Sequence, residues 1–362
     1  MNKATNSAMM RIKNEKIILS LINKMPISRV DISKITGLTK AAVTIIVDDF
    51  KKRGIVTEKN ALSKNKGRNP VMLYLNPDAF YFIGVNISRN SIGVGIVDLS
   101  GKVISSEEFV ICPPDKAYKK IADSIDNQVT KNNIDREKIH KISVAAPGPV
   151  DSNNGVILNP PNFTDWHGAC VSKELCALTS IQVVLQNVSS ATAISEKYFG
   201  SAHNTESFLS LIVDEGIGSG IIVNDVLFDG PCELGHVSIN YDGIKCECGN
   251  RGCLEKYASI PCILRCTGYN KWQEVVDAND TELMKREAKY ISSAIISARN
   301  IFMFDTVVLC GDLTYKTDTM INLITEQIQK RILTNDTLKV CAGEVKSKYV
   351  IAAASAIYDL FN

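Results

Sequence analysis

The stretch Cys246-Glu247-Cys248-Gly249-Asn250-Arg251-Gly252-Cys253 determines how one loop folds: it holds three thiols, and His236 lies upstream. Tetrahedral zinc takes this ligand set, and the two glycines let the loop turn tightly around an ion. A chance cluster of reduced thiols is the alternative, because the chain has 11 cysteines. The Cys-x-Cys-Gly-x-x-Gly-Cys spacing favours zinc, with His236, Cys246, Cys248 and Cys253 as ligands. Four protein ligands leave no open position for a reacting water, so this zinc is structural.

Length and composition indicate a globular protein of two or three domains. The chain has 362 residues, of which 45% are hydrophobic. It contains no run of apolar residues long enough to span a membrane, and residues 1–8 are polar. An odd number of cysteines spread over a long chain is typical of a reducing compartment. We therefore expect a cytoplasmic protein without a membrane span.

Charge is unevenly distributed along the chain. Residues 1–70 hold 15 Lys and Arg against 5 Asp and Glu, whereas the remainder holds 26 against 34. A basic module on an acidic body indicates a polyanionic partner for the first part only. A lysine-rich, solvated surface without such a partner is the alternative.

The first 75 residues have the pattern of a winged helix-turn-helix. Helices are predicted over 14–24, 29–36 and 39–53, with Gly37 in the turn between the last two. Apolar residues at three- and four-residue spacing give the third helix a buried stripe, made by Val43, Ile46, Val47 and Phe50. Short strands are predicted at 55–58 and 71–75, joined by a basic connection. Two helices around a glycine turn followed by such a ribbon predict a DNA-binding domain over residues 1–75.

The side chains of the third helix that lie off the buried stripe are expected to face DNA. The first residues of a recognition helix meet base edges in the major groove. The expected base-contacting set is Thr39, Lys40, Ala41, Thr44 and Ile45. Cations at the helix end and in the wing are expected on phosphates, namely Lys51, Lys52, Arg53, Lys64, Lys66 and Arg68. Thr39 also suits a plain helix cap, and the lysines also suit a solvated face.

From about residue 80 the pattern changes to alternating strands and helices. Strands are predicted at 81–85, 92–97, 102–104, 142–145, 183–185, 208–213, 220–223 and 306–309. Helices are predicted at 117–132, 191–199, around 255–300 and at 350–361. The order strand-strand-strand-helix-strand-helix occurs twice. This repeat resembles the duplicated, ribonuclease-H-like architecture of actin-type sugar kinases.

Residues 12–362 resemble the ROK family of bacterial sugar kinases and sugar-responsive repressors. The resemblance rests on Glu233-Leu234-Gly235-His236, on Cys246 to Glu255, and on Pro161-Asn162-Phe163-Thr164-Asp165-Trp166. Gly67-Arg68-Asn69-Pro70 is similar to the wing of the repressor branch, the only branch with an N-terminal helix-turn-helix. The resemblance implies an α/β protein: a winged helix-turn-helix, then a two-lobed actin-like sugar-kinase fold over 76–362.

The motifs that carry kinase chemistry in the family are altered. The glycine-rich first phosphate loop of the kinases corresponds to Asn86-Ile87-Ser88-Arg89-Asn90, and the second begins Asp214-Glu215-Gly216. The adenosine-side Gly-Gly corresponds to Cys310-Gly311. The catalytic Asp, which takes the proton from the sugar hydroxyl, corresponds to Val188. Valine cannot accept a proton, so we expect no kinase activity.

The sugar-binding positions of the family are better preserved. The resemblance places sugar contacts at Asn187, Glu233, His236 and Glu255, with Asn162 in the family's sugar loop. Carboxylates and amides suit a polyol, because each bridges adjacent hydroxyls. His236 has two ring nitrogens, one for the metal and one for the pocket. An ordinary surface role is the alternative for Glu233, Glu255 and Asn162.

These features together predict a sugar-responsive repressor of a carbohydrate operon. It would bind an inverted-repeat DNA operator as a homodimer or tetramer and be released by a sugar or sugar phosphate effector. One alternative is a sugar kinase with a fused DNA-binding module. Another is a regulator controlled by a protein partner, with an unused sugar pocket.

Overall fold

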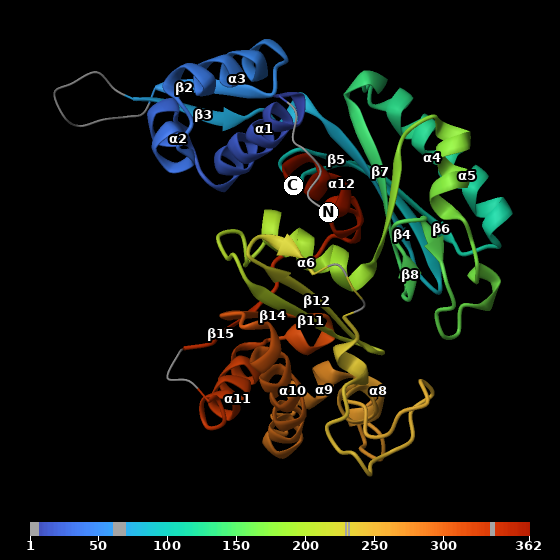
Figure 1. Ribbon diagram of the computed structural model, residues 1–362. Coiled ribbons are helices and arrows are strands. Elements are labelled where there is room, and N and C mark those ends of the chain that lie inside the picture. Colours follow the sequence, from blue (N-terminus) through green and yellow to red (C-terminus); the bar gives the residue numbers. More distant parts are fainter. Residues whose placement is uncertain (1–6, 61–69, 229, 231, 334–336) are drawn as a thin grey trace. The chain divides into compact units, whose positions relative to one another are not determined.

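The computed structural model describes residues 7–60, 70–228, 230, 232–333 and 337–362. Contacts divide the chain into two compact units, which are Met1–Asn187 with Ser347–Asn362, and Val188–Lys346. The ribbon diagram shows the elements of both (Figure 1). The predicted domains 1–75 and 76–362 follow a different division and stay a prediction. Within the described residues, no helix has the length and hydropathy required to cross a bilayer.

The N-terminal part of the first unit contains three helices, as predicted. They are α1 (Ser7–Lys24), α2 (Arg29–Thr36) and α3 (Lys40–Lys52). The Ser28 side chain accepts from Asp31 N at the start of α2, and Thr39 accepts from Ala42 N at the start of α3. The first helix begins at Ser7, earlier than the predicted residue 14. The prediction placed the start too late because the opening turns carry no continuous apolar stripe.

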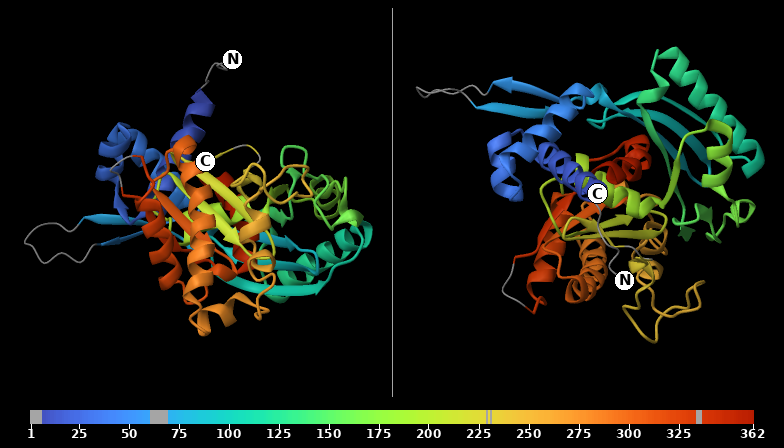
Figure 2. Two further views of the ribbon diagram at one scale, coloured as in Figure 1. Left: turned by 90° about the horizontal axis from the view of Figure 1, so that it is seen from below. Right: turned by 45° about the horizontal axis from the view of Figure 1, so that its top comes forward.

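A three-stranded sheet completes this part, with strand order β1-β3-β2. Its strands are β1 (Ile27–Ser28), β2 (Val56–Asn60) and β3 (Val71–Leu75). The ribbon β2–β3 is antiparallel, pairing Val56 with Leu75 and Asn60 with Val71, and it contacts the three helices (Figure 1 and Figure 2). Residues 61–69, the predicted tip with Lys64, Lys66 and Arg68, lie outside the described residues. The strand β1 was not predicted, because two residues give no periodic signal.

A five-stranded sheet forms the rest of the first unit, in the order β10-β7-β4-β5-β6. Inward residues of this sheet, such as Ile83 and Val85, pack with Ile121 and Leu175 of two helices, α4 and α5. The elements are β4 (Tyr81–Ile87), β5 (Ser91–Asp98), β6 (Val103–Val110), α4 (Pro114–Lys131), β7 (Ile139–Ala146), β8 (Val150–Asp151), β9 (Val156–Ile157), α5 (Val171–Thr179) and β10 (Val183–Asn187).

The C-terminal helix α12 (Lys348–Phe361) packs on the other face of this sheet. Side chains alternate along a strand, so Gly84 faces away from the side of Ile83 and Val85. A Cβ on Gly84 would lie 2.2 Å from the backbone oxygen of Tyr349, which only glycine permits. The same helix reaches the N-terminal module, because Lys16 Nζ donates to the carbonyl of Asp359 at 3.0 Å.

The second unit is built on a second five-stranded sheet, ordered β13-β12-β11-β14-β15. Numbered along the chain within each unit, both sheets have the order 5-4-1-2-3 or its reverse, which agrees with the predicted repeat and with a mixed α/β fold. Its strands are β11 (Phe208–Val213), β12 (Ile217–Val223), β13 (Val226–Leu227), β14 (Thr306–Cys310) and β15 (Lys339–Ala342). Its helices are α6 (Val188–Phe199), α7 (Glu255–Ala258), α8 (Ile260–Ile263), α9 (Trp272–Asp277), α10 (Thr281–Phe302) and α11 (Asp318–Gln329).

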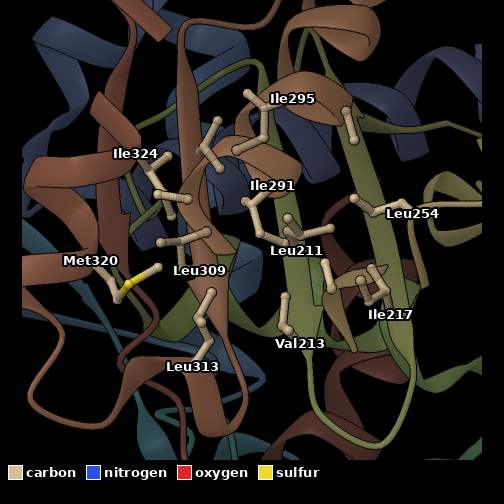
Figure 3. Packing of buried hydrophobic residues seen from close by; sticks show 14 of the residues in the cluster. Leu211, Val213, Ile217, Leu254, Ile291, Ile295, Leu309, Leu313, Met320 and Ile324 are labelled. Atoms are coloured by element: carbon tan, nitrogen blue, oxygen red, sulfur yellow. The ribbon is translucent and has the colours of Figure 1, made fainter. Parts of the chain in front are cut away.

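The core of the second unit lies between the sheet and the long helices. Figure 3 shows Leu211 and Leu309 of the sheet packed against Ile291 of α10 and Ile324 of α11. The predicted loop 214–219 is shorter than expected, because Ile217 is buried and pairs with Val213. The sequence obscured this strand, since the glycines beside Ile217 weaken the strand signal.

We expect Leu309→Ala to destabilise the second unit by about 2–5 kcal/mol, because Leu309 is fully buried and its truncation leaves a cavity. Leu333→Ala, at a side chain that is 84% exposed, is the matched control and should change stability by less than about 0.5 kcal/mol. Urea unfolding followed by Trp272 fluorescence in a Trp166→Phe background reports on this unit. Equal unfolding midpoints for the two variants would contradict the assigned core.

Candidate functional site

The four predicted metal ligands come together in the second unit. His236 ends a short 3-10 helix, Leu234–His236, and its Nδ1 lies 3.7 Å from Cys246 Sγ. Cys248 Sγ and Cys253 Sγ are 3.6 Å apart, and the ligand atoms of all four residues lie within 4.8 Å of one another. A tetrahedron with metal–sulfur bonds of about 2.3 Å has edges of about 3.7 Å. The side chains therefore fit one tetrahedral ion.

The backbone of the loop is shaped for this convergence. Cys246 N donates to Asn250 O at 2.9 Å, and Gly249 N donates to Cys246 O at 3.0 Å, which closes a tight turn. Gly252 has φ +69°, and a Cβ there would lie 1.6 Å from the backbone oxygen of Asn240. Another residue at 252 would therefore displace the segment that carries Cys253.

The thiols have the chemistry of metal ligands rather than of a disulfide. The sulfurs of Cys248 and Cys253 are too far apart for a bond of about 2.05 Å. Burial and the neighbouring thiols raise the pKa of Cys253 to about 12, whereas a backbone hydrogen bond from Asn250 lowers the pKa of Cys248. Without a cation, three adjacent thiols resist joint ionisation, and a divalent metal removes that repulsion.

Three of the predicted sugar residues lie beside the metal cluster in the chain. Glu233 is exposed and immediately precedes the 3-10 helix of His236. His236 directs Nδ1 toward the cluster, which leaves Nε2 for another partner. Glu255 begins α7, and its Oε2 accepts from Ile217 N at 2.8 Å. Glu255 thus already holds the start of β12, a structural role that the sequence did not reveal.

The other two predicted sugar residues belong to the first unit. Asn187 ends β10, and its amide lies against the loop at Gly148, where a Cβ would be 2.2 Å from Nδ2. Asn162 is exposed with φ +55°, next to Phe163, whose ring stacks on buried Trp166 at 5.6 Å. The five residues therefore form separate groups in the two units, and their joint pocket stays a prediction.

The Asp214 side chain lies between the two segments that the resemblance aligns with the nucleotide-binding loops of the kinases. Asp214 Oδ1 accepts from Asp312 N at 2.5 Å and would lie 2.3 Å from a Cβ on Gly311. Burial raises the pKa of Asp214. The Asp214 side chain thus fills the space between the loop at 214–216 and Cys310-Gly311 and would repel a triphosphate whenever it is ionised.

The outward face of α3 is exposed as predicted, and the stripe opposite it is buried. Lys40, Ala41, Thr44 and Ile45 are exposed, Ile45 by 63%. Thr44 Oγ1 donates to Lys40 O at 2.8 Å, an ordinary intrahelical hydrogen bond.

The end of α3 contains an ionic network that the sequence did not predict. Lys51 Nζ lies 2.5 Å from Glu58 Oε2, and Arg29 Nη2 lies 2.8 Å from Glu58 Oε1 and 2.7 Å from Asp48 Oδ1. Lys51 is therefore already paired with Glu58, although both Lys51 and Lys52 are exposed, and their predicted phosphate contacts stay a prediction. Asp48 follows Ile45 by three residues, and this spacing could have predicted that Asp48 lies on the outward face of the helix.

Comparisons with known proteins agree with the resemblance in the sequence. A sequence model described as the ROK family matches residues 82–356. The xylose repressor of Bacillus spizizenii is 27% identical over 336 residues, covering 88% of this chain and 87% of its own. The glucokinase of Thermotoga maritima is 33% identical over 199 residues, covering 52% of this chain and 61% of its own.

One solved structure covers nearly the whole chain. It is a ROK family transcriptional regulator described as a homolog of the E. coli MLC protein. It superimposes with a TM-score of 0.81 and 23% identity, over 97% of this chain and 98% of that one. At this identity the likeness supports the fold alone.

We expect purified protein to hold about one zinc per chain, measured by elemental analysis, because a closed tetrahedral site takes one ion. Cys248→Ser should lose the metal and lower the melting temperature, since metal binding energy is partly folding energy. Cys266→Ser, at an exposed cysteine outside the cluster, is the control. Metal affinity should also fall as pH falls, because the ligands must be deprotonated. Metal-free protein with an unchanged melting temperature would exclude a structural zinc.

Proposed function

The chain belongs to the ROK family, and from this premise we propose that it is a sugar-responsive transcriptional repressor. Residues 1–75 form a winged helix-turn-helix, and residues 76–362 form a non-catalytic sugar-binding body with a structural zinc. The protein binds an inverted-repeat operator as a homodimer or tetramer, and a sugar or sugar phosphate releases it. One observation carries the proposal: a module of three helices and a ribbon precedes a body that matches the ROK family. The resemblance puts Val188 of that body where the kinases have their catalytic base.

Local chemistry supports the absence of phosphoryl transfer. Val188 opens α6 and offers no proton acceptor for a sugar hydroxyl. The half-buried Asp214 carboxylate beside Gly311 disfavours a nucleotide triphosphate. A general base and a phosphate cradle are both needed for transfer, so loss of the two together points to regulation.

Charge and exposure support DNA binding by the N-terminal module. Residues 1–70 carry a large excess of cations. The helix α3 has 13 residues and an exposed face, as a recognition helix in the major groove requires. Lys40 is placed at the first turn of α3, where base edges and phosphates are both in reach. Ala41 and Ile45 offer apolar surface to a thymine methyl group.

Retained polar groups support a polyol effector. Glu233 is exposed, and its carboxylate bridges adjacent hydroxyls when it faces a sugar. Sugar affects DNA binding only when it binds the two conformations of the protein with different affinities. The similarity to a glucokinase favours a sugar kinase with a fused DNA-binding module as the second candidate, and a regulator controlled by a protein partner is the third.

ATP turnover would distinguish the kinase from the repressor. Sugar binding measured by calorimetry would distinguish the repressor from a regulator with an unused sugar pocket.

We expect Lys40→Ala to weaken operator binding and to lower the slope of log affinity against log salt by about 1, because one phosphate contact is lost. Genomic fragments that the protein retains supply the operator, and fluorescence anisotropy at several salt concentrations supplies the slope. Lys289→Ala, an exposed lysine of α10, is the control and should leave the slope unchanged. Wild-type protein that retains no fragment, or a Lys40→Ala slope equal to that of the wild type, argues against this DNA face.

Glu233→Ala should raise the dissociation constant of the inducing sugar, because a hydroxyl left unpaired in a desolvated pocket costs about 1–3 kcal/mol, roughly 5–150-fold. Thermal-shift screening against mono- and disaccharides and their phosphates identifies the sugar, and calorimetry measures the constant. DNA affinity without sugar should not change. Glu282→Ala, at a surface carboxylate, is the control.

No ATP turnover is expected with any sugar, and Val188→Asp alone should not create it, because Asp214 remains beside Gly311. A coupled ADP-release assay tests both proteins. Turnover by the wild type would replace the repressor proposal with the kinase.

A further inference from the structure

The outward face of α3 contains an acid among the residues expected to meet DNA. Ala41, Ile45, Asp48 and Lys52 follow at i, i+4, i+7 and i+11, so they lie along one line of the helix, and all four are exposed. The buried stripe with Val47 lies on the other side. A carboxylate on this line is unexpected, because it would approach a polyanion in a module with a strong excess of cations.

Asp48 is held in place rather than free to turn away. Arg29, the first residue of α2, donates Nη2 to Asp48 Oδ1 at 2.7 Å. The same guanidinium is fixed from behind by Glu58 Oε1, at 3.2 Å from Nε and 2.8 Å from Nη2. The hydrogen bond from Arg29 lowers the pKa of Asp48, so the carboxylate is ionised and acts only as an acceptor.

The second carboxylate oxygen of Asp48 is available to a ligand. The Asp48 side chain is 59% exposed despite its bond to Arg29. Among the described residues, no hydrogen bond reaches Asp48 Oδ2. Arg29, which also pairs with Glu58, therefore holds Oδ1 of Asp48 and leaves Oδ2 without a hydrogen bond on a largely exposed side chain.

The major groove offers few donors to an ionised carboxylate. Guanine and thymine present only acceptors besides the thymine methyl group, and adenine presents a donor beside the N7 acceptor, which repels a carboxylate. Cytosine presents the N4 amino group as its donor. An oriented carboxylate on a recognition helix thus matches cytosine better than any other base.

Resting on the proposed DNA-binding function, we infer that Asp48 is a specificity-determining residue that accepts a hydrogen bond from cytosine N4 in the operator, with Arg29 as its positioning residue. Asp48 would otherwise only repel the DNA, but held by Arg29 it favours the one base that offers it a donor without an adjacent acceptor. Guanine or thymine at that position leaves the carboxylate desolvated without a donor, and adenine places its N7 acceptor beside the donor, so each of the three lowers affinity.

The test is the base preference of the full-length protein, measured by selection from a randomised duplex library and sequencing. Wild-type protein should prefer cytosine about tenfold at one position of its site, the discrimination of one good base contact. Asp48→Ala should lose preference at that position and keep it elsewhere. Asp48→Asn should shift preference toward adenine, since an amide pairs with adenine N6 and N7. Arg29→Ala should weaken the same preference, and Arg29→Lys should restore part of it.

Asp49→Ala is the matched control, because Asp49 is the neighbouring acid of α3 and bonds to Arg53 at 3.3 Å on another side of the helix. Its preference profile should equal that of the wild type. An Asp48→Ala profile identical to the wild-type profile overturns the inference while DNA binding stands. A wild-type protein with no base preference at any position overturns the proposed function itself, so the two failures are distinguishable.

Discussion

The direct contact between α12 and the first sheet is the constraint on which the first unit depends. At Gly84 no side chain separates the strand from the backbone of Tyr349, so the helix approaches the sheet more closely than side chains normally allow. One face of the sheet would otherwise expose its apolar strands to water. Because α12 also accepts the Lys16 hydrogen bond, one helix supports both the sheet and the N-terminal module. A shift of α12 on the sheet therefore changes the support of α1.

Much of this architecture could be predicted from periodicity. The strands at 71–75 and 208–213 were predicted to the residue, and the predicted helix over 39–53 differs from the observed Lys40–Lys52 only at its ends. Apolar alternation, caps and glycine turns are local signals, so a single sequence carries them. Pairing partners and short strands are not local. The strand β1 depends on its pairing with β3, which is distant in the chain, and the early start of β12 at Ile217 was hidden by the glycines on either side of it.

The candidate site was predictable where residue spacing determines chemistry. His236 and the three cysteines share one short loop, and their convergence follows from that spacing. The bond from Ile217 N to Glu255 and the Asp48–Arg29 pair each join separate elements, so only the folded structure revealed them. The same contrast explains Lys51: its position on the helix was predictable, but its partner Glu58 on β2 was not. Whether the predicted sugar residues serve one ligand stays a prediction.

The order of the chain also bears on biosynthesis. The second unit, Val188–Lys346, is a continuous segment, whereas the first needs both Met1–Asn187 and Ser347–Asn362. A ribosome therefore emits every residue of the second unit before it makes the helix that covers the first sheet. Domains fold as units during translation, so the second unit is able to fold on the nascent chain while the first waits for α12. During that interval the uncovered sheet face is an apolar surface of the kind that a chaperone binds, so the order of synthesis delays completion of the first unit until every residue of the second has been made.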